Sequence, residues 1–501
     1  MPSGISPRYL RCVRQTMSVN FLKFSMWAGP LCAALLYVGL PVSFSSEGGR
    51  IVEIDDSIRV VLAVTVWMAI WWVAETIPMA ATALLPVTVF PILDVVSLKV
   101  AAAPYANPLI FLFLSGFLIS IALQKWGLHR RFAVSLLRRI GHEPVRVVGG
   151  FMLATAFLSM WLSNTATTIM MLPIALSVIG SEQHDSSYAK CLLLSVAYSA
   201  SIGGLATLIG TPPNLYVASY FNDVLGIEIG FLQWMAIGVP CVVLLLPAAW
   251  WYLTRVHFSL PVPSNRTPAA INGPGLVWAE LGFGERATLV IFGALICGWV
   301  TRPWINDLTI FGAVPFSHLT DTGVALVAAI ALLIIPVNLT ERKFVLDWPD
   351  TQELPWGTLI LFGGGLSLAA AINATGADQV IGLWVSRMPP ISPIVIITVL
   401  VGIVILLTEL TSNIATTATL VPVLAAAAPL LLLEPKLVIV MVALAASCAF
   451  MLPVATPPNA IVFATGRIRA SEMASAGAIM NLVALLVISA VGSILIPLVL
   501  V

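Results

Sequence analysis

The stretch that decides the fold reads SMWLSNTATTIMMLPIA from Ser159 to Ala175, because it recurs as TELTSNIATTATLVPVL from Thr408 to Leu424. The copies are 249 positions apart, and both lie in apolar sequence that holds a Ser-Asn pair, two threonines and a proline. The superimposed residues are Ser163 and Ser412, Asn164 and Asn413, Thr167 and Thr416, Thr168 and Thr417, and Pro173 and Pro422. Polar identity on this scale indicates an internal duplication.

Two further pairs of segments follow the same order. An offset of 249 brings LFLSGFLISIALQKWG (Leu112 to Gly127) onto LFGGGLSLAAAINATG (Leu361 to Gly376), and an offset of 245 brings GTPPN at Gly210 onto ATPPN at Ala455. The repeated unit therefore covers residues 105–221 and 354–466. Because the first pair of segments is rich in glycine, we expect a re-entrant hairpin there in each half. Repeats in secondary transporters surround a substrate near the bilayer midplane, often with inverted topology.

Composition places the chain in a membrane. Of its 501 residues, 59% are hydrophobic and 9% charged, whereas soluble domains have about 25% charged residues. Many uncharged stretches reach the roughly 20 residues that a membrane-spanning helix needs, and we expect ten to twelve crossings. We predict an integral protein of a bacterial inner or plasma membrane, with a cytoplasmic N-terminus, because basic residues mark cytoplasmic loops. They cluster at Arg8, Arg11, Arg14 and Lys23, and at Arg130, Arg131, Arg138 and Arg139.

Other classes of protein lack support. Five of the six cysteines lie in apolar stretches without the spacing of metal ligands. The sequence has no phosphate-binding loop, dinucleotide fingerprint or nucleophile elbow, and its basic clusters do not interleave with aromatic residues. We expect no enzyme activity, no organic cofactor and no nucleic-acid partner.

The Ser-Asn motifs have the chemistry of helix breaks. Ser, Thr and Asn cap helix starts, and a helix that restarts inside the membrane directs its N–H groups and its positive dipole end at an anion. Unwound carbonyl oxygens beside the break suit sodium, and the prolines of GTPPN and ATPPN supply a second break in each half. Ser and Thr also pack between membrane helices, but the fixed offset of two such motifs favours a binding site.

Two carboxylates within apolar sequence are further candidates, because an unpaired charge is costly there. Glu75 is expected either to pair with a basic residue at a helix end or to couple protons. Glu409, beside the second motif, is expected either to hold the geometry of the break or to carry a proton.

With these motifs, and with WWVAETIPMAATALLP from Trp71 to Pro86, the sequence resembles the divalent anion/sodium symporter family, which includes INDY-type di- and tricarboxylate carriers. The resemblance implies an all-α, inverted-repeat transporter of the elevator type, with two re-entrant hairpins and broken helices, working as a homodimer. It implies a first sodium site at Ser159, Ser163, Asn164 and Gly210, and a second at Thr408, Ser412, Asn413 and Ala455. It implies substrate contacts from Asn164, Thr165 and Thr211 in one half, and from Asn413, Thr456 and Pro457 in the other.

One position departs from the family. Ile414 stands where the second motif usually has a threonine whose hydroxyl helps to bind a carboxylate. We therefore expect the first half to be the stronger anchor for the substrate, and little effect on sodium.

The resulting prediction is a carrier that couples sodium to uptake of small dicarboxylates such as succinate, malate or fumarate, with citrate as a further candidate. Sodium-independent exchange, proton coupling and sulfate transport are the alternatives. The predicted organisation is a cytoplasmic segment 1–23, scaffold helices 24–104, transport elements 105–221, scaffold helices 222–353, transport elements 354–466 and a C-terminal helix 467–501.

Overall fold

The computed structural model describes residues 19–45, 51–139, 143–180, 187–260, 275–311, 313–380 and 392–500. The basic residues Arg8, Arg11 and Arg14 lie outside the described residues. Within them, eight helices are long and apolar enough to cross a membrane, and five further apolar helices are shorter. The predicted helical membrane protein is confirmed.

In the first repeat the helices are α7 (Pro108–Lys125), α8 (Leu128–Leu137), α9 (Pro144–Ser159), α10 (Asn164–Ile179), α11 (Ser187–Gly204) and α12 (Pro212–Tyr220). In the second repeat they are α16 (Trp356–Thr375), α18 (Pro393–Leu410), α19 (Asn413–Ala427), α20 (Pro435–Ala446) and α21 (Pro457–Phe463). Apart from α8, each of these helices of the first repeat has a counterpart in the described residues of the second, in the same order. Long helices follow each half, α13 (Phe231–Trp251) and α22 (Ala470–Val499).

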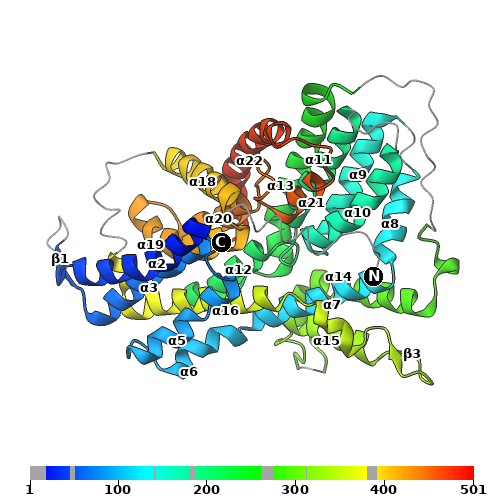
Figure 1. Cartoon of the computed structure of the whole chain (residues 1–501). Coiled ribbons are helices and arrows are strands. Elements are labelled where there is room, and N and C mark those ends of the chain that lie inside the picture. The colour runs from blue at the N-terminus through cyan, green and yellow to red at the C-terminus, as the bar shows by residue number, and fades with distance from the viewer. Residues whose placement is uncertain are drawn as a thin grey trace.

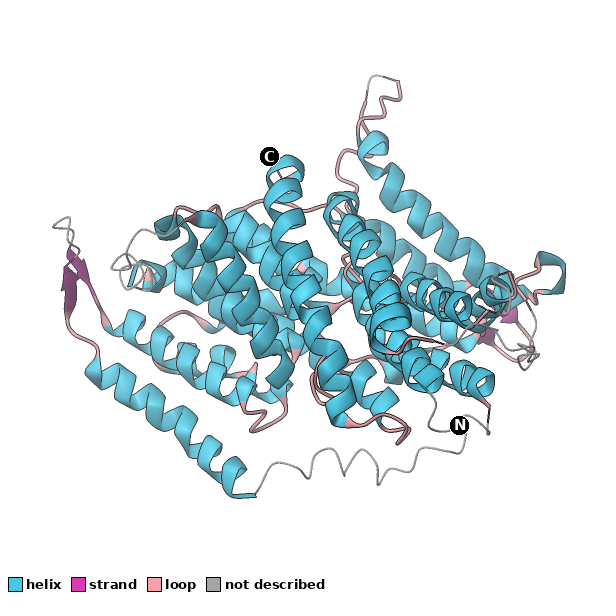
Figure 2. Cartoon of the chain, turned by 90° about the horizontal axis from the view of Figure 1, so that it is seen from above, coloured by secondary structure: helices cyan, strands magenta, loops and turns pink. Residues whose placement is uncertain are grey.

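The remaining helices precede each repeat. They are α2 (Val19–Gly39), α3 (Asp56–Val73), α4 (Met79–Thr82), α5 (Leu85–Ile92), α6 (Leu98–Ala102), α14 (Phe283–Asn306) and α15 (Asp321–Ile334). We call these seven helices, together with α7 and α16, the flanking helices. We call α9–α13 and α18–α22 the break-bearing helices. Two short hairpins of strands, β1 (Ser43–Ser45) with β2 (Ile51–Glu53) and β3 (Pro336–Asn338) with β4 (Lys343–Phe344), lie at the periphery (Figure 2).

The glycine-rich segments do not form the expected hairpins, and that prediction is wrong. Both lie in single continuous helices, α7 and α16. The glycines of α16 serve close packing instead: a Cβ at Gly363 would meet the Tyr105 ring at 2.3 Å, and one at Gly364 would meet the backbone of Ala83 at 2.2 Å. The turns of the repeated segments come at their ends, where Gly127 and Gly376 have φ angles of 65° and 77°, a conformation that favours glycine.

The hairpins lie instead at the Ser-Asn motifs. Helices α9 and α10 have 16 residues each, and the connection between them is the short stretch that ends at Ser163. Helices α18 and α19, with 18 and 15 residues, are joined in the same way at Ser412. The 16 residues of α9 or of α10 make a helix only about 24 Å long, which is less than the hydrocarbon core of about 30 Å. In the second half, α18 and the stretch Asn413–Leu431 are among the eight helices long enough to cross.

The flanking and break-bearing helices occupy different sides of the molecule (Figure 1). Helix α7 packs against α14 and α15, and α16 packs against α3, α4 and α5. Among the break-bearing helices, α11 packs on α9, α19 on α20, and α13 on α22. The two groups meet where α12 and α19 contact α16, so the breaks lie near the middle of the molecule.

Candidate functional site

Each Ser-Asn motif caps a restarting helix. Ser163 has extended backbone angles, and its hydroxyl accepts a hydrogen bond from the N–H of Ala166 at 3.3 Å. Ser412 does the same for the N–H of Ala415, also at 3.3 Å. The N-cap position and the break were both predicted from the residue types, and both predictions are confirmed.

The Pro-Pro-Asn segments form the second pair of breaks. Thr211 is the N-cap residue of α12 and Thr456 that of α21, and a proline occupies the first turn of each helix. Proline suits this position because its missing N–H would have no intrahelical acceptor. The hydroxyl of Thr456 accepts from the N–H of Asn459, whereas Thr211 makes no such cap with its side chain.

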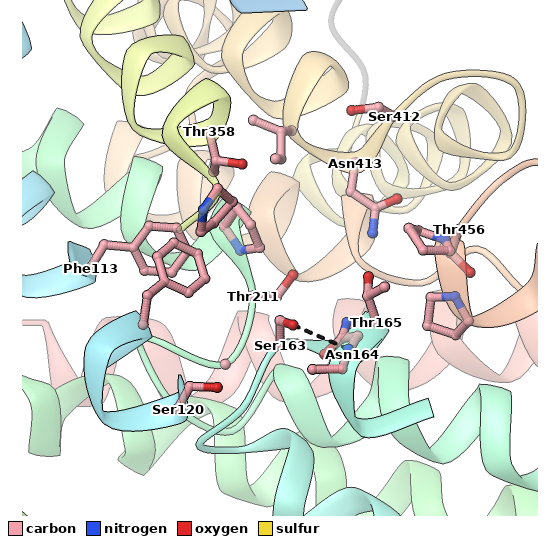
Figure 3. A pocket seen from close by; sticks show the side chains of 18 of the residues that line it. Phe113, Ser120, Ser163, Asn164, Thr165, Thr211, Thr358, Ser412, Asn413 and Thr456 are labelled. Atoms are coloured by element: carbon pink, nitrogen blue, oxygen red, sulfur yellow. Dashed lines mark hydrogen bonds between the residues drawn. The ribbon is translucent and has the colours of Figure 1, made fainter. Parts of the chain in front are cut away.

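All four N-cap residues line one cavity of about 700 Å³. Figure 3 shows Asn413 and Thr456 of the second half facing Asn164, Thr165 and Thr211 of the first. The six predicted substrate-binding residues, Asn164, Thr165, Thr211, Asn413, Thr456 and Pro457, all line this cavity. So does Ile414, the apolar departure in the second motif.

The cavity carries no positive side chain. Its lining, within the described residues, contains no Lys, Arg or His, but it does contain the exposed carboxylates of Glu75 and Glu353. Positive potential comes instead from the N-terminal ends of α10 and α19, whose first N–H groups have no intrahelical acceptor. An anion here can be bound by N–H groups, hydroxyls and amides.

A cluster of three oxygen atoms lies behind each hairpin tip, the connection between two helices that carries the Ser-Asn motif. Ser159 Oγ is 2.8 Å from Asn164 Oδ1 and 2.7 Å from the carbonyl oxygen of Ala200. A hydroxyl has one proton, so it can donate to only one of these two acceptors at a time. The cluster thus has more acceptors than donors, which suits a hard cation such as sodium.

The second half repeats this cluster. Thr408 Oγ1 is 2.9 Å from Asn413 Oδ1 and 2.7 Å from the carbonyl oxygen of Ala446. Ser159 and Thr408 are fully buried behind the cavity wall, while the other residues predicted for sodium (Ser163, Asn164 and Gly210; Ser412, Asn413 and Ala455) line the cavity. The oxygen atoms gathered in each half are ligands of the kind that sodium prefers.

Glu409 is a structural anchor in this geometry. Its carboxylate is 3% exposed and accepts hydrogen bonds from the N–H groups of Phe450, Met451 and Leu452 at 2.7, 2.9 and 2.9 Å. The amide of Asn481 adds a fourth at 2.8 Å. These four hydrogen bonds tie the segment after α20 to the end of α18, so of the two predicted roles the structure favours holding the geometry of the break.

Glu75 follows α3 with a φ angle of 44° and lies at the cavity wall. Within the described residues it forms no salt bridge, so the expected pairing with a basic residue is not seen. His129 contacts the carbonyl oxygen of Leu123 at 3.1 Å and is not part of the cavity.

Sequence reasoning missed several members of the site. The carbonyl oxygens of Ala200 and Ala446 carry no signal in the sequence, because every residue has one. Helices α7 and α16 add Phe113, Phe117, Ser120, Gln124 and Thr358 to the cavity wall, and the short 3-10 helix Trp348–Glu353 before α16 adds Glu353. Of these, Glu353 carries a signal in the sequence, as a carboxylate directly before the second repeated unit, 354–466.

Comparison with known proteins gives consistent results. A family model described as the sodium:sulfate symporter transmembrane region matches residues 52–501. The sodium-dependent dicarboxylate transporter SdcS of Staphylococcus saprophyticus is 39% identical over 94% of this chain and 91% of its own length. Its counterpart in Staphylococcus aureus is 38% identical over 88% and 86% of the two chains.

Two solved structures share the fold. The MtrF protein of Neisseria gonorrhoeae aligns with a TM-score of 0.59 and 13% identity, covering 97% of each chain. The YdaH transporter of Alcanivorax borkumensis aligns with a TM-score of 0.56 and 12% identity, covering 95% of this chain and 97% of its own. At this identity the likeness concerns the architecture alone.

Proposed function

Because the chain belongs to the sodium:sulfate symporter family, we propose that it is a secondary transporter that couples the sodium gradient to uptake of a small dicarboxylate. The observation that carries the proposal is the cavity in which four helices begin and which, in the part of the chain that the structure describes, no positive side chain lines. A dianion bound there needs cations to balance its charge, and the two oxygen clusters are placed to hold them.

The geometry suggests how the dianion is held. Asn164 Oδ1 is turned toward Ser159, so its Nδ2 is left to donate to a carboxylate together with the hydroxyls of Thr165 and Thr211. Asn413 is turned toward Thr408 in the same way and acts with Thr456. Sodium ions bound in the two oxygen clusters would hold these amides in place and balance the charge of the substrate. Substrate binding should therefore require sodium.

The movement would be of the elevator kind, with the break-bearing helices sliding along the flanking helices. The packing of α7 and α16 against α15 and α3 supports a scaffold that includes both helices. On this basis the moving elements begin after α7 and α16, later than residues 105 and 354. The finer proposals are a homodimer in a bacterial plasma membrane with its N-terminus in the cytoplasm.

The test is uptake of labelled succinate into liposomes that contain the purified protein. An inward sodium gradient should drive accumulation, and an equal potassium gradient should not. Asn164→Ala and Asn413→Ala should abolish uptake, and Thr398→Ala on the exposed face of α18 should leave it unchanged. Accumulation without sodium, driven by a proton gradient or by an internal counter-anion, would contradict sodium coupling, and sulfate competing better than succinate would contradict the substrate class.

A further inference from the structure

Asn214 closes the GTPPN segment, and its side chain is fully buried. Its Nδ2 donates two hydrogen bonds, to the carbonyl oxygen of Gly204 at 2.9 Å and to that of Thr207 at 2.8 Å. The amide therefore ties the end of α11 and the unwound segment after it to the first turn of α12.

Asn459 makes the equivalent pair of bonds in the second half. Its Nδ2 donates to the carbonyl oxygens of Ala449 at 3.2 Å and Leu452 at 3.0 Å, and its side chain is also fully buried. Each of the three residues is 245 positions from its counterpart in the first half. The two breaks are held by the same device.

The oxygen atom of each amide, Oδ1, differs from the nitrogen in this respect. Within the described residues, Oδ1 of Asn214 and Oδ1 of Asn459 are buried without a hydrogen-bond partner. The orientation of each amide is fixed, because a flip would set Oδ1 against two carbonyl oxygens. An unpaired buried acceptor is destabilising, and its occurrence at both equivalent positions points to a ligand that both halves bind.

Asn214 lies beside the first oxygen cluster, with Gly204 between them. A Cβ at Gly204 would meet Asn164 Oδ1 at 2.5 Å, and a Cβ at Gly210 would meet the carbonyl oxygen of Gly204 at 2.5 Å. Asn164, Gly210 and Asn214 therefore surround one glycine. Two of the three are residues predicted for the first sodium site.

We propose that Asn214 and Asn459 are positioning residues of the two sodium sites. Nδ2 fixes the carbonyl groups of the unwound segment, and Oδ1 offers an oxygen to the sodium ion or to a water molecule in its shell. The inference rests on the proposed sodium coupling. It adds to each site a residue that touches the ion's surroundings and not the dicarboxylate, since neither asparagine lines the cavity.

The test is a sodium titration of thermal unfolding with the purified full chain in detergent, without substrate, at constant ionic strength set with potassium. A ligand that binds only the folded state raises its stability by mass action. In Asn214→Ala and in Asn459→Ala we expect the sodium concentration at half-maximal shift to rise about tenfold or more, as is typical when a partner of a metal ligand is lost.

Controls separate this effect from a loss of packing. Melting in potassium alone reports the structural cost of each variant, and Asn214→Leu and Asn459→Leu keep the volume if an alanine variant does not fold. Ser199→Ala removes a buried hydroxyl of α11 that, among the described residues, bonds to carbonyl oxygens of its own helix, and it should leave the titration unchanged.

The outcomes distinguish the two proposals. If sodium stabilises the unaltered protein no better than potassium does, the proposed sodium coupling fails. If sodium stabilises the unaltered protein and a folded variant of either asparagine has the same half-maximal concentration, the positioning role is overturned while the coupling stands.

Discussion

Ser159 and Thr408, 249 positions apart, have side-chain oxygens that make the same two contacts: each touches the amide oxygen of an asparagine five residues later and a backbone carbonyl oxygen 2.7 Å away. A serine and a threonine can replace each other here because only the hydroxyl is used. The internal symmetry of the chain is thus preserved in individual atoms as well as in the order of its helices.

Removing either hydroxyl should weaken sodium activation of transport. Ser159→Ala and Thr408→Val each delete one oxygen of a cluster, and we expect the sodium concentration at half-maximal uptake to rise about tenfold or more. Sodium-dependent succinate uptake measures this. Thr398→Val is the matched control, because Thr398 lies on the same helix as Thr408 and its hydroxyl donates to the carbonyl oxygen of Ile394 in that helix. An equal effect in the control would assign the loss to the helix.

Neutralising Glu409 should loosen the segment after α20. Glu409→Gln replaces a carboxylate that accepts four hydrogen bonds with an amide whose NH₂ group faces N–H donors. We expect the free energy of unfolding to fall by about 2 kcal/mol or more, since a bond to a charged group contributes about 1.5–3 kcal/mol.

Thermal unfolding in potassium measures this loss, with Glu434→Gln at the exposed start of α20 as the control. A proton-carrying role would give another result: the variant would keep its stability and lose the pH dependence of uptake.

The breaks could be predicted from the sequence because capping is local chemistry. Ser163 and Ser412 accept from the N–H three residues later, which any Ser-Asn pair before a helix can do. Because the two halves are related by duplication, the sequence also predicted that their breaks lie around one binding site. The hairpins were misplaced because glycine in a membrane helix has two uses, turns and close packing, and the sequence does not say which applies at Gly363 and Gly364.

The oxygen clusters could not be completed from the sequence. The carbonyl groups of Ala200 and Ala446 belong to helices that come close only in the folded chain. Three of the four partners of Glu409 are likewise backbone N–H groups. Backbone atoms have no residue-type signal, so the side chains of each site could be predicted from the sequence and its backbone groups could not.

Placing a hydroxyl at position 414, in the second Ser-Asn motif, should tighten substrate binding. Ile414→Thr places at the cavity wall the group that Thr165 provides in the first half. One additional hydrogen bond of about 1 kcal/mol corresponds to a KM for succinate about fivefold lower. Ile414→Val, which adds no hydroxyl, should leave KM unchanged, and Thr165→Val should raise it; a decrease in the valine variant of Ile414 would show that side-chain size is the cause.

The carboxylates of Glu75 and Glu353 should oppose the approach of a dianion. Both are exposed at the wall of a cavity whose described lining has no positive side chain, so each repels the substrate, and the repulsion is screened as salt is added. We expect Glu75→Gln and Glu353→Gln to lower the KM for succinate about twofold at low ionic strength, the size of a weak solvent-exposed charge interaction. The difference should vanish as choline chloride is added at saturating sodium. Glu280→Gln, an exposed carboxylate outside the cavity, should show no change. If KM in the cavity variants is unaltered at every ionic strength, or rises, the two glutamates act on something other than the charge of the substrate.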